Sequence, residues 1–327
     1  MTSDTVQFCG ATFTTNTEIV ALANVYPLAL DPLKALTHLR ELRLIQTNPH
    51  RSPVGLPFTL DPLAALDSLE VLVLPKLAIY DLAPLSGLRL LREVDVSGTA
   101  IEDLSPLQGN AYLRVLRLRG TKVRTLEPLR GLSQLAVLDS AYTNVTDLSC
   151  LEGLHSLTEL HIEGTGMVDL APLRGLDRLA VLTFDSTPVE SLDVLRNLRW
   201  FHTAQRLDLS GTRIVDITGI ETASAVAELL LFNTQVSDLT PLAHLARLRV
   251  LRLDNTPVVD IAPLAELSAL EDLSLAGTSV RSLTPLHGLH QLRSIDLSGT
   301  SVTPTEAAAL RRAIPGAEIL GLTASER

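Results

Sequence analysis

The sequence predicts an α/β solenoid, a chain wound into coils with a curved parallel β-sheet on the concave side and short helical turns on the convex side. Three observations lead to this fold class: a 22-residue period, an alternation of leucines at the centre of each period, and a Pro and a Gly that bracket a short turn. One such coil is too small to bury its own leucines. Stacked coils bury them against one another, so the repeats are expected to share one aliphatic core.

One apolar phrase, L-x-x-L-x-L-x-x-T-x-V-x-D-L-x-P-L-x-G-L-x-x, recurs along the chain. Of the 13 intervals between its 14 copies, 11 are 22 residues long, and the longer ones, from Leu39 to Leu69 and from Leu179 to Ala204, mark insertions. No linker interrupts the series. We therefore predict a single domain over 1–327, with an amino-terminal cover at 1–16, about 13 repeats over 17–313, and a capping strand and tail at 314–327.

Each copy predicts the same local elements. The L-x-L centre, for instance Leu116 and Leu118, alternates with a period of two and indicates a short strand with one buried face. The few residues between Pro128 and Gly131 leave room only for a 3₁₀ turn, after which the glycine reverses the chain. Residues of capping type stand just before this turn in several copies, namely Ser105, Asp193, Thr240 and Thr284.

The ninth position of the phrase is threonine in almost every full copy. A polar group that recurs in an apolar frame must find hydrogen bonds. We expect the hydroxyls to bridge backbone groups of adjacent coils, the alternative being a turn residue that points to solvent. The column comprises Thr47, Thr99, Thr121, Thr143, Thr165, Thr187, Thr212, Thr234, Thr256, Thr278 and Thr300.

Both ends need a cover, because a terminal coil would otherwise expose its apolar side. Phe8 and Phe13 are the expected lids of the first coil, and a helix over about 305–313 followed by a strand near 317–320 is expected at the other end. Ser140 and Asn110 occupy slots that are apolar in the other copies. Both are expected to find backbone or water partners, because an unpaired buried polar group is costly.

The phrase LRVLRLRGTKVRTLEPLRGL of residues 113–132 resembles the leucine-rich repeat, in the short 22-residue class of bacterial internalin-like and phosphatase-regulating repeat proteins. The resemblance spans about 17–320. It implies a right-handed superhelix whose members typically bind proteins through the concave sheet. The chain departs from the family's common Asn at the ninth position and lacks the secretion signal and surface anchor of internalins, which argues against an adhesive role at the cell surface.

Composition narrows the class of partner. With 27 Lys and Arg against 37 Asp and Glu, the net charge of −10 disfavours nucleic acid and anionic membranes. No apolar run is long enough to span a bilayer, and the start of the chain lacks the pattern of a cleavable signal. The only cysteines, Cys9 and Cys150, are far apart, so two free thiols are expected. These features predict a cytoplasmic, monomeric protein, with export without a cleavable signal as the alternative.

No catalytic motif is present. The sequence has no G-x-S-x-G, H-E-x-x-H or P-loop pattern, and the short GTG of 164–166 belongs to a repeat turn. His287 and His290 lack a third ligand in their turn, and Cys150 stands where other copies have proline, which indicates packing. We predict a non-enzymatic protein without a cofactor or metal.

Candidate partner-binding residues follow from the repeat register, because positions 3, 5, 7 and 8 point away from the core. Arg117 and Arg119 are expected to pair with Asp95 and Asp139, the alternative being that a phosphate or carboxylate of a partner docks there. His161 stands among carboxylates and is a candidate pH-sensitive position. Apolar or aromatic groups on this face are expected anchors, the alternative being a solvated face of balanced charges. The face candidates are Arg117, Arg119, Asp139, Tyr142, His161, Glu163, Asp185, Leu230, Phe232 and Arg252.

The inserts at 48–59 and 199–201 are further candidates, since loops that depart from a rigid frame often carry function. Trp200 is either a binding tip or a plug over the widened coil. Together these features predict a scaffold that binds a protein or peptide on its concave face. The alternatives are a secreted bacterial effector that recognises a host target, and a regulatory subunit or activating protein of a phosphatase or GTPase.

Overall fold

The computed structural model describes residues 5–24, 29–45 and 59–321. The chain divides into two compact units, Met1–Leu182 and Thr183–Arg327, which are described separately. The single-domain assignment therefore stays a prediction. Thr47 and nearly all of the insert at 48–59 lie outside the described residues.

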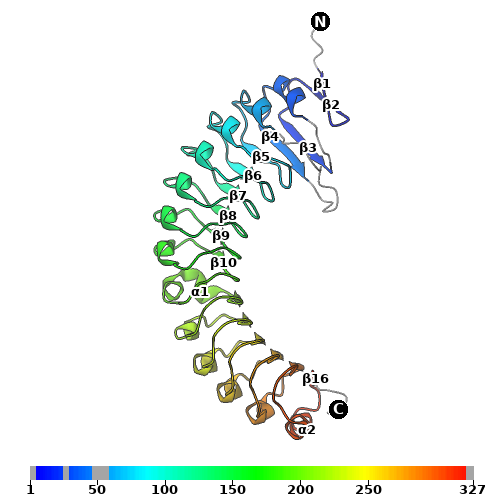
Figure 1. Cartoon of the computed structure of the whole chain (residues 1–327), viewed down its shortest axis with the longest axis vertical. Helices are drawn as coiled ribbons and strands as arrows, with labels where there is room; N and C mark the ends of the chain where they lie inside the picture. The colour runs from blue at the N-terminus through cyan, green and yellow to red at the C-terminus, as the bar shows by residue number, and fades with distance from the viewer. Residues whose placement is uncertain (1–4, 25–28, 46–58, 322–327) are drawn as a thin grey trace. The chain divides into compact units, whose positions relative to one another are not determined.

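Short parallel strands recur once per coil, as the period predicts. In the described residues they form an eight-stranded sheet (β3 to β10) and a six-stranded sheet (β11 to β16), each in chain order (Figure 1). The strands are β3 Ile19–Ala23, β4 Glu41–Ile45, β5 Val71–Val73, β6 Glu93–Asp95, β7 Val115–Arg117, β8 Val137–Asp139, β9 Glu159–His161, β10 Val181–Thr183, β11 Arg206–Asp208, β12 Glu228–Leu230, β13 Val250–Arg252, β14 Asp272–Ser274, β15 Ser294–Asp296 and β16 Glu318–Leu320.

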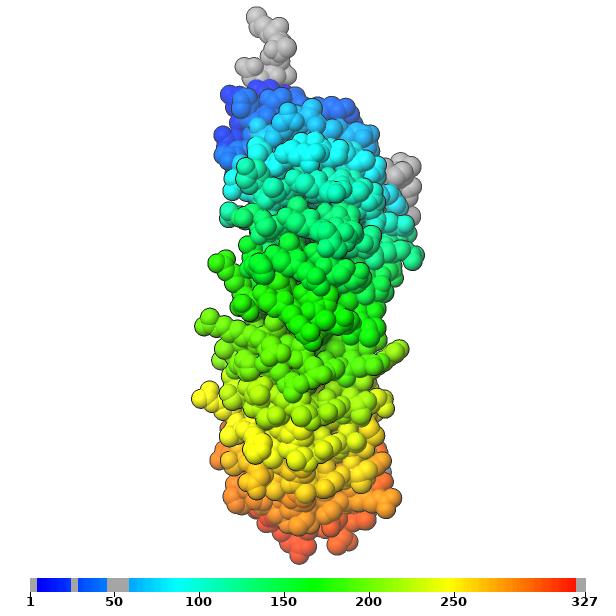
Figure 2. Space-filling model, turned by 90° about the vertical axis from the view of Figure 1, so that its left-hand side faces the viewer, coloured from blue at the N-terminus to red at the C-terminus, as the bar shows by residue number. Residues whose placement is uncertain are grey.

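A short 3₁₀ helix follows each strand from β3 to β14. These are Asp31–Ala35, Asp61–Leu63, Ala83–Leu85, Ser105–Leu107, Glu127–Leu129, Ser149–Leu151, Ala171–Leu173, Leu195–Asn197, Ile220–Thr222, Thr240–His244, Ala262–Glu266 and Thr284–Gly288. The α-helices in the described part of the chain are α1 Arg199–Thr203 and α2 Pro304–Ala313. Figure 2 views the turn side, where the coils within each unit appear as stacked bands.

The cap of most 3₁₀ turns differs from the expected one. Ser105 is the first residue of its turn and not the cap, and its hydroxyl donates to the Asp103 Oδ2 at 2.6 Å. The cap is an aspartate whose Oδ1 accepts the N–H two residues later, which is the first N–H of the 3₁₀ helix in every such coil except that of Asp216, where it belongs to Thr218. Seven coils share this bond at 2.7–2.9 Å, from Asp81, Asp103, Asp147, Asp169, Asp216, Asp238 and Asp260. The D of the repeat phrase is therefore the residue that fixes the turn.

The threonine column is hydrogen-bonded and, except for the half-buried Thr300, buried, but it does not form a ladder between coils. Each described ninth-position hydroxyl donates to the carbonyl oxygen three residues earlier in its own coil, as Thr234 does to Leu231 at 2.7 Å. Thr99, Thr121, Thr143, Thr165, Thr187, Thr212, Thr256, Thr278 and Thr300 do the same. The prediction that the hydroxyls bridge coils was wrong, because the sharp bend after the strand brings this carbonyl within reach first.

Both expected covers are present. An antiparallel hairpin, β1 Thr5–Phe8 and β2 Ala11–Thr14, precedes the first coil and buries Phe8, while Phe13 is half-buried. At the other end α2 begins after its cap Thr303. Glu306 accepts a hydrogen bond from the Leu283 N–H at 2.9 Å and so ties α2 to the preceding coil.

The two polar residues in apolar slots behave differently. Ser140 is fully buried and its hydroxyl reaches the His161 carbonyl oxygen at 3.4 Å, as expected. Asn110 is also fully buried, yet neither polar atom of its amide has a hydrogen-bond partner within the described residues. The expectation of a backbone partner for Asn110 was therefore wrong.

Candidate functional site

The first group of candidate residues lies on neighbouring strands of unit 1. Arg117, Asp139 and His161 are directly opposite one another on β7, β8 and β9, as the repeat register predicts. The His161 Nε2 lies 2.8 Å from the Glu159 Oε1 on the same strand. Burial raises the pKa of the Asp139 carboxyl above its usual value. The sequence thus placed these groups correctly in one row.

Arg119 is the centre of this group. Its guanidinium pairs with Glu163, which is almost fully buried, and lies 3.9 Å from the Asp139 carboxylate. It also stands over the Tyr142 ring, 4.7 Å from the ring centroid, in cation–π geometry. The same guanidinium therefore neutralises carboxylates below it and holds an aromatic ring beside it.

Tyr142 adopts a left-handed backbone conformation, with φ of 54°. This is the turn position after the strand, where most other coils place glycine or asparagine and two place Lys76 and Ser186, and the conformation is strained for a bulky residue. The ring lies against Gly164 of the next coil, where a Cβ atom would come within 2.5 Å of it. With 53% of Tyr142 exposed, the aromatic ring is held in a fixed place and remains open to a partner.

Arg117 pairs differently from the expectation. Its Nη1 lies 3.0 Å from the Glu93 Oε1, and Glu93 also binds Arg43 at 2.9 Å. The predicted partner Asp95 instead accepts a hydrogen bond from the Ser97 N–H, two residues later in its own coil. The pairing with Asp95 was therefore wrong, because a long arginine side chain reaches a carboxylate at position 3 of the preceding coil.

The second group forms a shallow hollow of about 450 Å³ in unit 2, which we call the Phe232 hollow. Leu230 is only 7% exposed, whereas Phe232 is half-buried, so the expectation of two open apolar groups holds for Phe232 alone. The hollow is lined by Glu228, Leu230, Phe232, Arg252 and Asp254. Arg252 pairs with Asp272 at 3.3 Å, and Asp254 accepts a hydrogen bond from the Ser274 hydroxyl. Both charged side chains at the rim of the hollow therefore already have partners within the protein.

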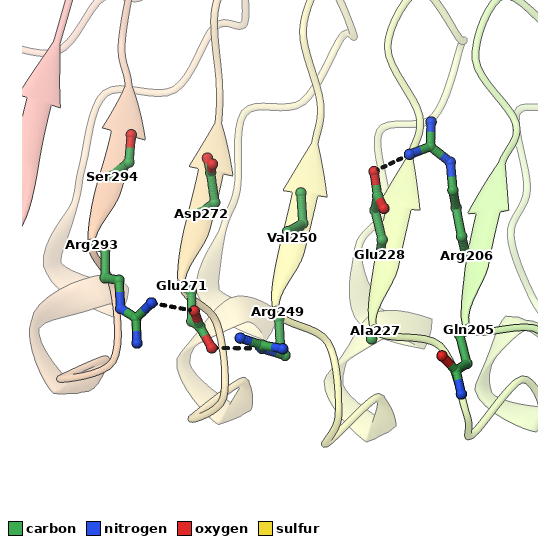
Figure 3. A pocket seen from close by; sticks show the side chains of 10 residues that line it. All are labelled: Gln205, Arg206, Ala227, Glu228, Arg249, Val250, Glu271, Asp272, Arg293 and Ser294. Carbon is green, nitrogen blue, oxygen red and sulfur yellow. Dashed lines mark hydrogen bonds and ion pairs between the residues drawn. The ribbon is translucent and has the colours of Figure 1, made fainter.

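A larger depression of about 520 Å³, which we call the edge groove, lies at the amino ends of β11 to β15 (Figure 3). Arg249 and Arg293 stand on either side of Glu271, and Arg206 reaches across to Glu228 at 2.5 Å. Sequence reasoning missed this site, because the outward positions it considered, 3, 5, 7 and 8, leave out position 2, and no candidate was chosen from position 3. The available signal was the alternation Arg249, Glu271, Arg293 at position 2, in steps of 22 residues.

The remaining candidates do not join these groups. Trp200 lies in the one-turn helix α1, is 7% exposed and packs beside Phe201, so it is the plug and not the binding tip. Asp185 is half-buried after β10 and lines neither the Phe232 hollow nor the edge groove.

The described residues contain no group of three or more His, Cys, Asp or Glu arranged to hold a metal ion, and no helix among them is long and apolar enough to cross a membrane. Both cysteines are free thiols. Burial raises the pKa of the Cys150 thiol to about 12, so it stays protonated at neutral pH and acts as a packing group.

Comparison with solved structures identifies the fold, whereas no protein-family model and no curated protein matches the chain. An internalin from Listeria monocytogenes superposes with a TM-score of 0.80 at 21% identity, covering 96% of this chain and 90% of that one. A leucine-rich-repeat protein of Leptospira interrogans superposes with a TM-score of 0.68 at 17% sequence identity, covering 93% of this chain and 90% of that one. The ectodomain of the receptor kinase GASSHO1 of Arabidopsis thaliana superposes with a TM-score of 0.68 at 18% sequence identity, covering 89% of this chain and 36% of that one.

The chain therefore has the leucine-rich-repeat fold, as its repeat phrase indicates. The similarity to internalins agrees with the short-repeat class. At these identities the similarity defines architecture, and the candidate sites are features of this chain's own residues.

Proposed function

We propose that this chain is a non-enzymatic scaffold that holds a protein or peptide partner on its sheet face, with the Phe232 hollow as a main contact. The observation that carries the proposal is a half-buried phenylalanine that lines a hollow on a face where most of the charged groups are already paired with one another. Binding energy concentrates on large apolar groups that a partner can desolvate fully. A face built of short strands is rigid, so little entropy is lost when a partner docks.

The repeat fold supports the same proposal. The Arabidopsis ectodomain is in complex with Casparian strip integrity factor 2, and another structure of similar fold is the LRIM1/APL1C complex. In unit 1, the exposed ring of Tyr142 offers a second contact, which Arg119 holds in place. We further propose a cytoplasmic location, which two free thiols support.

The test is affinity capture with three immobilised forms: the parent chain, Phe232→Ala, and Val259→Ala as a matched control. Val259 is an exposed apolar residue that does not line the hollow. A true partner is retained by the parent and the control and lost with Phe232→Ala, which we expect to cost about 2 kcal/mol or more of binding free energy. Equal retention by all three forms would contradict the proposal.

The identity of the captured protein separates the finer roles. A phosphatase or GTPase points to a regulatory subunit or activating protein, and a host protein points to an effector. Circular dichroism of each variant must match the parent, because Phe232 also packs against its neighbours.

A further inference from the structure

The outward face of the unit-2 sheet carries more carboxylates than guanidiniums. Over β11 to β15, the outward positions and the position before each strand hold Asp208, Glu228, Asp254, Glu271, Asp272 and Asp296 against Arg206, Arg249, Arg252 and Arg293. All four arginines bind carboxylates of this set, at 2.5–3.5 Å, and three of them are drawn in Figure 3. Among the described residues, Asp254 and Asp296 are the two carboxylates of the set that have no guanidinium partner.

Asp254 is the one of these two carboxylates that lies beside Phe232. It lines the Phe232 hollow, whereas Asp296 belongs to β15, two coils further on. In the described part of the chain its side chain has one hydrogen-bond partner, the Ser274 Oγ, which lies 2.5 Å from its Oδ1. Arg252 also lines the hollow, but it is bound to Asp272. Asp254 therefore keeps an uncompensated negative charge, and its Oδ2 can still accept hydrogen bonds.

Unit 1 contains a related pair of aromatic ring and carboxylate, and there the chain's own arginine occupies it. Arg119, Tyr142 and Glu163 come from three successive coils, at positions 7, 8 and 7 of the repeat phrase. The Arg119 guanidinium lies 4.7 Å from the centroid of the Tyr142 ring and pairs with Glu163. In this protein, the group that such a pair holds is thus a guanidinium.

Unit 2 has the aromatic ring and the carboxylate without the arginine. Ser210, Phe232 and Asp254 occupy position 7 of three successive coils, so they lie in one row across the sheet face. Phe232 is the aromatic residue, one position earlier in its coil than its counterpart in unit 1, and Asp254 stands at the position of Glu163. The short side chain of Ser210 stands at the position of Arg119. Within the described residues, the Phe232 ring therefore has no guanidinium over it, and the hollow of about 450 Å³ lies beside it.

We propose that the Phe232 hollow receives an arginine side chain of the protein partner, whose guanidinium lies against the Phe232 ring and donates to the Asp254 carboxylate. A guanidinium is planar and weakly hydrated, so it stacks on an aromatic face and presents paired N–H donors to a carboxylate. An ammonium is more strongly hydrated and lacks this planar fork, so lysine fits less well. This inference rests on the proposed role of Phe232 and adds the chemistry of the partner.

The probes are acetyl-Gly-Arg-Gly-amide and the same peptide with citrulline, which has nearly the shape of arginine but no charge. Their binding to the ¹⁵N-labelled full chain is followed by NMR titration at about 0.1 M salt, where charges beyond about 10 Å are screened. We expect the arginine peptide to bind about tenfold more tightly than the citrulline peptide, because its hydrogen bonds to the carboxylate are charge-assisted. The amide signals that shift should belong to β12, β13 and the turns that follow them.

Three variants locate the site. Asp254→Asn keeps the shape of the side chain and an acceptor for the Ser274 hydroxyl, and it should abolish the preference for arginine. Asp296→Asn is the matched control, because it removes the same charge from the other carboxylate without a guanidinium partner, and it should leave the preference unchanged. Phe232→Ala should weaken the binding of both peptides. The comparison of the two peptides on the parent chain needs no variant, so it holds even if one of them folds poorly.

The outcomes separate this inference from the proposed function. Equal binding of the two peptides to the parent, no binding of the arginine peptide at about 10 mM, or an equal loss of preference in Asp254→Asn and Asp296→Asn overturns the arginine site. Binding of acetyl-Gly-Lys-Gly-amide as tight as that of the arginine peptide overturns it in favour of a general cation site. If the parent shows no preference while Phe232→Ala weakens both peptides, the role of Phe232 stands and the arginine site fails. If the preference persists and Phe232→Ala weakens neither peptide, the proposed role of Phe232 fails, and with it the stacking of the guanidinium on the ring.

Discussion

Replacing Asn110 with leucine should stabilise the protein. The Asn110 side chain is fully buried in a slot that leucine fills in the neighbouring coils, where Leu88 and Leu132 are 0% and 3% exposed. The amide nitrogen and oxygen have no hydrogen-bond partner in the described residues. Leucine has the same branching as asparagine, so Asn110→Leu changes polarity with little change of shape.

The expected gain follows from the two unpaired atoms. A buried polar group without a partner costs about 1–3 kcal/mol, and an apolar group of the same shape removes this cost. Leucine should not overpack this slot, because its two Cδ atoms take the places of the Asn110 Oδ1 and Nδ2 atoms. We therefore expect a gain of about 2 kcal/mol in the free energy of unfolding, or about 4–8 °C in melting temperature for a unit of this size.

The assay is thermal unfolding followed by circular dichroism, with urea unfolding as a second measurement. Asn144→Leu serves as the control. Asn144 is exposed, so this substitution adds a leucine to the surface and not to the core. It should change the melting temperature little. The reciprocal Leu132→Asn should lower it, since it creates the same unpaired amide one coil away.

A lower melting temperature in Asn110→Leu would refute this reasoning. It would mean that the amide is satisfied in the folded protein and that the polar atoms contribute to stability. A gain in Asn144→Leu equal to that in Asn110→Leu would also contradict it, because the effect would then come from added apolar surface and not from the buried slot.

Two further predictions concern unit 1. Gly164→Ala should destabilise the protein more than Gly120→Ala, as measured by urea unfolding; both residues have φ near 65°, but only at Gly164 does the new Cβ meet the Tyr142 ring. Equal losses would show that the ring is not held against Gly164. With a thiol reagent at pH 8, Cys9 should react in the native protein and Cys150 only after denaturation, because Cys150 is buried and the pKa of its thiol is about 12. Rapid reaction of both native thiols would contradict this placement.

Much of the candidate site could be located from the repeat register. A strand alternates its side chains, so the outward row Arg117, Asp139 and His161 followed directly from the spacing. The pairing of these charges did not follow. Arg117 reaches Glu93 and Arg119 reaches Glu163, because a long flexible side chain chooses among several carboxylates at similar distances.

The edge groove could have been recognised from the sequence and was not. Arg249, Glu271 and Arg293 recur at one position of the phrase, so their proximity follows from the period. The open depression beside them depends on the small side chain of Ala227 and on how the arginines lie over Glu271. Such side-chain conformations are decided by packing and ion pairing.

The sequence by itself determined the coil, its period and its buried positions, because a 22-residue phrase with one apolar pattern permits only stacking. It also determined the need of each ninth threonine for a hydrogen bond. The tertiary structure decided which acceptor that hydroxyl takes, that Trp200 lies inside, and that Asn110 has no partner among the described residues. These outcomes depend on distances of a few ångströms between groups in neighbouring turns, which spacing along the chain does not specify.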